Sequence, residues 1–205
     1  MATKIARHPR PGRYRVAMLK LGQKAPAFSL PSTSGATVSL ASLKGKPVVL
    51  YFYPRDNTPG CTVEACDFRD QHSALQKAGA VVLGVSADSL KSHAGFRAKF
   101  ELPFDLLVDE GSKVASAYGA FGEKLMYGRK VQGTIRSTFL IDASGSIAAI
   151  WSPVKVKGHV EAVLATLNGA PAAAPAPAKP KAAKKTAPAK PKASKKAATR
   201  KPTGR

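Results

Sequence analysis

Residues 48–66 read VVLYFYPRDNTPGCTVEAC, and this stretch decides how the rest of the chain is interpreted. Its first six residues, Val48 to Tyr53, are apolar or aromatic, which is typical of a strand buried on both faces. Pro54 ends the run, and a turn rich in Asp, Asn, Pro and Gly leads to a helix that we expect to begin at or near Cys61. A buried strand that passes through a short turn into a helix indicates an α/β fold.

The same alternation of short apolar runs and longer amphipathic stretches extends from Leu21 to Asn168. It predicts further strands over 80–86 and 137–142, and helices over 62–78, 89–100, 112–118 and 160–168, the last ended by Gly169. The turn at 142–145 should lead into an antiparallel edge strand over 146–151. Strands joined by helical crossovers predict a mostly parallel sheet with helices on both faces.

The chain carries a large excess of positive charge, +21 over 205 residues. Residues 170–205 hold 11 Lys and Arg and no acidic residue, and residues 1–20 hold six and again no acid. The remaining 16 basic residues face all 12 acidic ones, so residues 21–169 have a net charge of only +4. This distribution predicts a basic N-terminal extension over 1–20, one domain over 21–169 and a basic tail over 170–205.

No apolar run reaches the roughly 20 residues that span a bilayer, and the N-terminus lacks the apolar core of a secretory signal. A soluble, cytoplasmic protein is therefore expected. The Arg-rich N-terminus shares some features with organelle transit peptides, but it is poor in Ser and contains Pro9 and Pro11. A translation start at Met18 instead of Met1 is an open alternative.

Cys61 has the position of a reactive cysteine. In the first turn of a helix it faces unpaired backbone N–H groups and the positive end of the helix dipole, both of which stabilise a thiolate. Thr58, three residues upstream, can direct its hydroxyl at whatever the sulfur attacks. Pro54 and Pro59 should stiffen the loop and shield the sulfur from water.

Cys66 follows five residues later, a spacing that is neither the C-x-x-C of dithiol oxidoreductases nor that of a metal site. In an intact α-helix the two cysteines lie about 140° apart around the axis and about 7.5 Å apart along it. A disulfide tolerates a Cα separation of roughly 7 Å at most. If Cys61 and Cys66 pair, the first helical turns must therefore unwind.

The segment from Pro54 to Cys61 matches the P-x-x-x-T-x-x-C motif of the peroxiredoxins, and the continuation TVEACDFRD resembles their bacterioferritin-comigratory, or peroxiredoxin Q, branch. Further similar segments follow in the order GVSADS (84–89), LPFDLL (102–107), Tyr118-Gly119 and IRSTFLID (135–142). The resemblance extends from about Leu21 to Asn168 and leaves out both basic ends.

The resemblance implies a thioredoxin-like fold and a thiol peroxidase that reduces hydrogen peroxide and organic hydroperoxides. It implies that Cys61 is the peroxidatic nucleophile and becomes a sulfenic acid. Thr58 and the Cys61 N–H would hold the peroxide, and Arg136 would stabilise the thiolate and the leaving oxygen. Cys66 would resolve the sulfenic acid as an intrachain disulfide, reduced by thioredoxin or a similar dithiol. The resemblance implies neither a cofactor nor a metal, and it implies a monomer.

Other polar and aromatic residues have simpler interpretations. Glu64 is explained by the favourable charge of a helix first turn, with a bond to Arg136 or to a backbone amide as the alternative. Histidines without a ligand-like spacing are expected to be solvated or locally bonded: His72, His93 and His159. Aromatic residues are expected to pack in a strand or at the edge of the core: Tyr51, Phe52, Tyr53 and Trp151.

The tail contains the related segments KPKAAKK (179–185) and KPKASKK (190–196), which resemble the C-terminal tails of linker histones. Its lysines, Lys184, Lys185, Lys195 and Lys196 among them, predict non-specific DNA or RNA binding through counterion release, and hence association with the nucleoid. Without aromatic or branched aliphatic residues the tail should be disordered and cannot stack on bases. A purely solubilising appendage is the alternative.

Two other functions compete with a peroxidase. A nucleic-acid-binding redox sensor would be oxidised once per molecule, whereas an enzyme turns over with its reductant. A general disulfide oxidoreductase is disfavoured because the chain lacks C-x-x-C.

Overall fold

The computed structural model describes residues 19–126 and 129–169, with the side chains of 124–126 and 129 excepted. The predictions for the first 18 residues and for the tail, including Lys184, Lys185, Lys195 and Lys196, lie outside the described residues. Within this part, no helix is long and apolar enough to cross a membrane.

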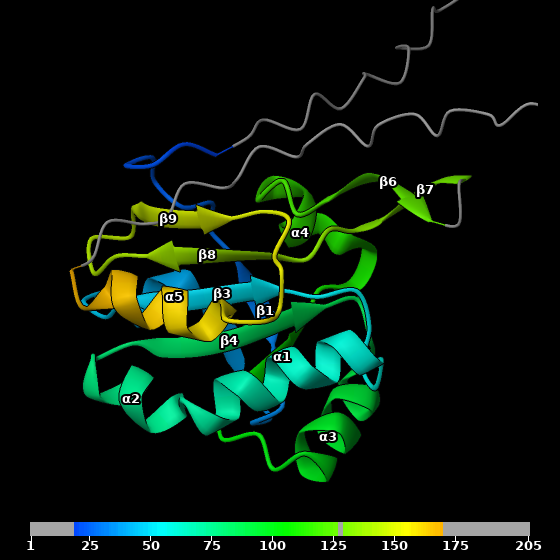
Figure 1. Ribbon diagram of the computed structural model, residues 1–205, viewed down its shortest axis with the longest axis horizontal. Helices are drawn as coiled ribbons and strands as arrows, with labels where there is room; N and C mark the ends of the chain where they lie inside the picture. The colour runs from blue at the N-terminus through cyan, green and yellow to red at the C-terminus, as the bar shows by residue number, and fades with distance from the viewer. Residues whose placement is uncertain (1–18, 127–128, 170–205) are drawn as a thin grey trace, which may run out of the picture. The chain divides into compact units, whose positions relative to one another are not determined.

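The centre of the fold is a five-stranded sheet of β3 (Val48–Phe52), β4 (Val81–Ser86), β5 (Asp105–Val108), β8 (Ser137–Ile141) and β9 (Ile147–Trp151), in the order β5-β4-β3-β8-β9 (Figure 1). β3 and β5 pair with β4 in parallel, whereas β8 pairs antiparallel with both β3 and β9. The sheet is therefore mixed, with β8 running against the other four strands. β9 is the antiparallel edge strand that the 142–145 turn predicts.

The helices are α1 (Pro59–Asp70), α2 (His72–Lys77), α3 (Leu90–Lys99), α4 (Lys113–Ala117) and α5 (His159–Leu167). The single helix expected over 62–78 is two helices, because the backbone leaves the helical conformation at Gln71, with φ −95° and ψ 4°. α1 also begins earlier than predicted, at Pro59. Proline is favoured at the first position of a helix, because the N–H that it lacks would have no acceptor within the helix. Gly169 follows α5 with φ +90°, as a helix-ending glycine should.

Several short elements have no clear signal in the sequence. They are the hairpin of β1 (Ser29–Pro31) and β2 (Thr37–Ser39), the hairpin of β6 (Phe121–Met126) and β7 (Arg129–Thr134), and the 3₁₀ turns η1 (Leu40–Leu43) and η2 (Glu110–Ser112). β5 is likewise not predicted. β1, β2 and β5, with three or four residues each, are too short for the alternation of apolar and polar residues to show. β6 and β7 have six residues each, but they contain charged residues and glycine, which are uncommon in strands.

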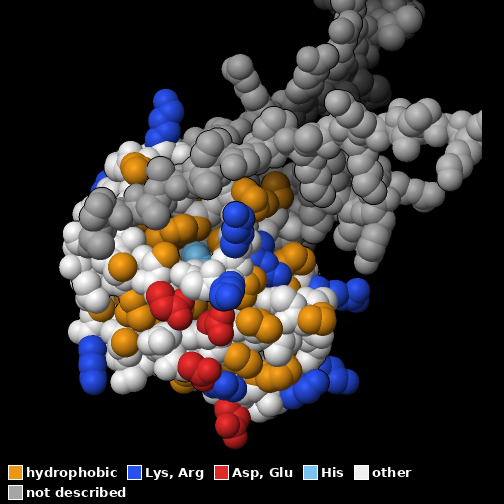
Figure 2. Space-filling view, viewed as in Figure 1, with side chains coloured by type: hydrophobic (Ala, Val, Ile, Leu, Met, Phe, Trp, Pro, Cys, Tyr) orange, Lys and Arg blue, Asp and Glu red, His pale blue; other side chains and the backbone are white. Residues whose placement is uncertain are grey.

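Charged side chains of both signs share the face of the molecule seen in Figure 2. Acidic side chains gather near the middle of this face, with Lys and Arg around them and apolar side chains between. Such a mixed surface is what a net charge of only +4 over 21–169 predicts.

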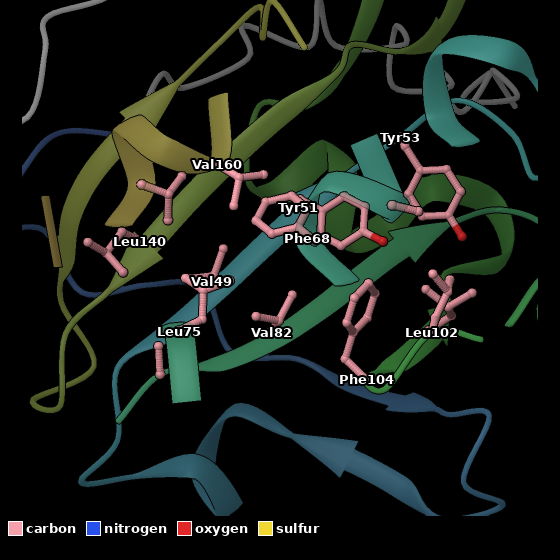
Figure 3. Close-up of a cluster of buried hydrophobic side chains, with 14 of the residues drawn as sticks. Val49, Tyr51, Tyr53, Phe68, Leu75, Val82, Leu102, Phe104, Leu140 and Val160 are labelled. Carbon is pink, nitrogen blue, oxygen red and sulfur yellow. The ribbon is translucent and has the colours of Figure 1, made fainter. Parts of the chain in front are cut away.

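Two apolar clusters cover the two faces of the sheet. One joins the sheet to α1, α2, α3 and α5 and contains Tyr51 and Phe68, whose rings stack with centroids 4.7 Å apart (Figure 3). The other packs α4 and the N-terminal segment against the opposite face and contains Phe52 and Phe139. Every residue of β3 is at most 1% exposed, which confirms a strand buried on both faces. Tyr51, Phe52 and Tyr53 are core residues, as predicted, and so is Trp151 at the edge strand.

Gly84 lets Tyr51 lie across the neighbouring strand. The two residues are paired in register, and a Cβ on Gly84 would come within 2.6 Å of the Tyr51 hydroxyl and 2.7 Å of Leu106. No side chain larger than hydrogen fits there. This packing places the Tyr51 ring under α1, the helix that carries both cysteines.

Candidate active site

Cys61 lies in the first turn of α1, with Thr58 as the residue preceding the helix. The first-turn amides of a helix have no helical acceptor, so this is the position predicted to stabilise a thiolate. The Cys61 side chain is only 2% exposed, and its thiol is free. A buried thiolate loses its hydration and depends on donors that the protein supplies.

Arg136 supplies such a donor. Its Nη2 donates to the Cys61 Sγ over 3.2 Å. Arg136 precedes β8, and because β8 runs antiparallel to β3, with Ser137 opposite Phe52, the start of β8 lies beside the end of β3. The sheet register therefore brings together two residues that are 75 positions apart in the chain.

Glu64 holds the other side of the same guanidinium. It lies one helical turn after Cys61, is fully buried, and accepts a hydrogen bond from the Nη1 of Arg136. Burial raises the pKa of Glu64 to about 7, although the charge of Arg136 opposes this shift. Among the described residues, nothing bonds to the second carboxylate oxygen, Oε1.

Arg136 therefore faces two groups that can carry negative charge. Its burial lowers its pKa, but the charges of Glu64 and Cys61 outweigh this effect and the net pKa is raised. The bond between Glu64 and Arg136 is confirmed, whereas the first-turn interpretation of Glu64 is wrong, because α1 begins at Pro59 and its first turn contains no acidic residue. The spacing of three residues between Glu64 and Cys61 is the sequence signal that could have placed Glu64 in the site.

The loop before α1 is closed on itself at Thr58, whose hydroxyl donates to the backbone oxygen of Arg55 over 3.0 Å. That bond uses the hydroxyl proton and leaves the oxygen able to accept a hydrogen bond. Pro54 and Pro59 are exposed and form the outer surface of the loop, and their shielding of the sulfur stays a prediction.

Cys66 lies in the same intact helix as Cys61 and is half-buried and unpaired. The structure thus has the geometry of the reduced dithiol. No group of three or more His, Cys, Asp or Glu between 19 and 169, outside the undescribed positions, could hold a metal ion.

Two of the three histidines are bonded inside the protein, which is one of the two outcomes expected of them. The ring of His93 is fully buried and bonds to Asp56, and His159 bonds through Nε2 to the Thr138 hydroxyl over 2.8 Å. His72 is half-buried, and burial lowers its pKa.

Comparison with known proteins assigns this arrangement to a family. Residues 21–150 match the model of the AhpC/TSA family. The chain belongs to this family, that of the peroxiredoxins. It is 50% identical to the peroxiredoxin Bcp of Bacillus subtilis over 150 residues, which are 73% of this chain and 96% of the relative.

Solved structures of peroxiredoxins agree with the fold. The bacterioferritin comigratory protein of Xanthomonas campestris is 41% identical, with a TM-score of 0.68, over 73% of this chain and 98% of that one. The PrxQ of Xylella fastidiosa, solved as a mutant, is 36% identical, with a TM-score of 0.70, over 74% and 97% of the two chains. This peroxiredoxin therefore has the thioredoxin-like fold that the resemblance implies and the peroxidase activity of its family. About a quarter of its length has no counterpart in these relatives.

Proposed function

We propose that Cys61 is the nucleophile that reduces the peroxide. Its thiolate attacks the terminal oxygen of a hydroperoxide, the O–O bond breaks, and the products are a Cys61 sulfenic acid and the alkoxide, which takes up a proton and leaves as an alcohol or as water. The observation that carries this proposal is the 3.2 Å contact between Arg136 Nη2 and Cys61 Sγ at the start of a helix. A cation beside a buried thiolate stabilises it for attack.

Arg136 and Thr58 are proposed to hold the peroxide. The guanidinium stabilises the charge that develops on the leaving oxygen, and the Thr58 oxygen accepts a hydrogen bond from the hydroperoxide. Glu64 fixes the guanidinium in the orientation in which its second nitrogen faces the sulfur. Hydrogen peroxide and organic hydroperoxides are the proposed substrates; alkyl peroxide reduction is the activity studied for the Xanthomonas campestris relative.

Cys66 is the proposed resolving cysteine. Its thiolate attacks the sulfur of the Cys61 sulfenic acid and forms the Cys61–Cys66 disulfide, and the hydroxide that leaves takes up a proton and becomes water. Because both residues lie in the intact α1, this step requires the first turns of the helix to unwind. Thioredoxin or a similar dithiol then reduces the disulfide and becomes oxidised in its place.

The test is peroxide-dependent consumption of NADPH through thioredoxin reductase and thioredoxin. The native chain should turn over continuously, and Cys61→Ser should be inactive. Cys66→Ser should lose its dependence on thioredoxin, although peroxide should still oxidise its Cys61 once. Amide hydrogen exchange on the oxidised chain should show faster exchange over 59–66 and unchanged exchange in α3.

Sustained turnover by Cys61→Ser would overturn the assignment of the nucleophile. A native chain that is oxidised only once, with reductant present, would favour the redox sensor. Reduction of disulfide substrates without any peroxide would favour a general disulfide oxidoreductase.

A further inference from the structure

A buried, hydrogen-bonded pair, Asp56 and His93, lies at the loop that carries Thr58. Asp56, in this loop, is 6% exposed, and its carboxylate accepts hydrogen bonds from the Tyr53 and Ser92 hydroxyls, each over 2.7 Å. The third donor is the Nδ1 of His93, at 2.9 Å from Oδ2 and 3.1 Å from Oδ1. The sequence pattern does not single out Asp56. The peroxidase chemistry proposed above uses neither Asp56 nor His93.

Both ring nitrogens of His93 are bonded inside the protein. Its Nε2 lies 3.2 Å from the backbone oxygen of Leu107, which can only accept a hydrogen bond, so Nε2 is the donor there. Its Nδ1 lies against both carboxylate oxygens of Asp56. Burial raises the pKa of Asp56, but the hydrogen bonds from His93 and Ser92 outweigh burial and lower it.

The pair ties the loop to three elements of the fold. His93 and Ser92 belong to α3, and Leu107 belongs to β5. The backbone N–H of Asp56 donates to the Asp88 carboxylate over 2.9 Å. This carboxylate also accepts a hydrogen bond from the Ser86 hydroxyl at the end of β4. One residue of the loop is thus bonded to the described scaffold on both its backbone and its side chain.

Only four residues separate this anchor from Cys61. Asn57 follows with a left-handed backbone, φ +57°, and Thr58 comes next, directly before α1. Such a short connection leaves little freedom between the two ends, so the position of Asp56 sets the position of Thr58 and of the first turn of α1.

We propose that His93, acting through Asp56, is a positioning residue that holds the peroxide-binding loop in its reactive geometry and marks where the unwinding of α1 stops. This inference rests on the roles proposed for Cys61, Thr58 and Cys66. The two chemical steps need opposite states of the helix. Attack on peroxide needs the first turn intact, and disulfide formation needs it unwound. An anchor at Asp56 favours the intact state, so weakening it shifts the population towards the unwound state.

The test compares the two steps by rapid mixing of the full chain with hydrogen peroxide, in the native protein, in His93→Gln, in Asp56→Asn and in the double variant. Oxidation of Cys61 should slow by about tenfold or more in each variant, whereas disulfide formation should be as fast as in the native chain or faster. The double variant should be no slower than the single ones, because each removes the same pair. Ile147→Ala, on the other face of the sheet, is the control with a lowered Tm but an intact anchor, and should slow neither step.

Equal slowing of both steps, or oxidation of all three variants at the native rate, would overturn the anchor and leave the pair a purely structural one. If His93→Gln does not fold, Ser92→Ala removes one donor and keeps the bond between His93 and Asp56, and it should slow Cys61 oxidation alone, by roughly threefold. No effect there would also overturn the proposal. If the native chain itself is not oxidised by peroxide, it is the proposed function that fails, and the inference with it.

Discussion

At the scale of single residues, the site is organised around one cation. Arg136 is shared between the Cys61 sulfur and the buried carboxylate of Glu64, and its forked guanidinium can serve both because its two nitrogens point in different directions. A lysine could reach one of them at a time. Burial raises the pKa of Glu64 to about 7, whereas the neighbouring charge of Arg136 opposes this shift.

The spacing of this contact can be tested at Gly60. A Cβ at this position would lie 3.3 Å from Arg136 Nη2, so Gly60→Ala should push the guanidinium a few tenths of an ångström from the sulfur. We expect the rate of Cys61 oxidation by peroxide to fall severalfold, measured by rapid mixing, with little loss of stability because Ala favours the helix by up to about 1 kcal/mol.

Gly95→Ala is the matched control, because Gly95 is also helical and a Cβ there meets nothing within 4 Å. It should raise stability by up to about 1 kcal/mol and leave the rate unchanged. Equal rates in the two variants would mean that the Arg136 position does not limit the reaction.

At the scale of the elements, the two ends of α1 are held differently. Phe68, in a later turn of α1, is buried and stacks on Tyr51 of β3, and this contact holds the later turns on the core. The first turn of α1, by contrast, has no side-chain cap. The end that we propose to unwind is therefore the end without a side-chain cap.

α5 depends on one buried histidine. His159 bonds to Thr138 of β8 and packs edge-on against Phe68 of α1 and Trp151 of β9. Burial, with a further contribution from the charge of Arg136, lowers its pKa from 6.5 to about 4. The neutral ring is therefore the form that the fold favours.

This shift predicts a loss of stability in acid. The stability due to neutral His159 is fully present above pH 6.5 and is lost as the pH falls through about 4, by up to about 3 kcal/mol. Urea unfolding of the native chain between pH 7 and pH 4 should show this fall, and His159→Gln should lack that part of the slope whatever its stability at pH 7. His72→Gln is the comparison, since His72 is less buried. Identical pH slopes for all three proteins would contradict the assignment.

At the scale of the whole molecule, charge and chemistry are divided along the chain. Residues 21–169 carry a net charge of +4 and both cysteines, while the ends carry 17 of the 33 basic residues. DNA or RNA binding through the tail, and association with the nucleoid, remain predictions from composition. Nothing in the chemistry at Cys61 requires them.

Deletion of 170–205 should separate the two properties. Each phosphate neutralised by the tail contributes about −0.9 to the slope of log K against log salt for duplex DNA, so 11 basic residues set an upper limit of about 10 on the magnitude of this slope. The truncated chain should lose most of the slope and of the affinity and keep its peroxide turnover.

Replacement of Lys184, Lys185, Lys195 and Lys196 by Gln keeps the tail length and should reduce the magnitude of the slope by up to about 4. A native chain that shows no salt-dependent binding would leave the tail as a solubilising appendage.

Much of this molecule can be read from local sequence. The apolar run at Val48, the turn after it and the periodicity of the helices predict the α/β class, because each depends on residues within a few positions of one another. The same holds for Cys61 at a helix start. The contacts of Cys61 with Arg136 and of Asp56 with His93 depend on the pairing of β8 with β3 and on the packing of α3. Only the tertiary structure decides these contacts, because they join distant residues and derive their strength from being removed from water together.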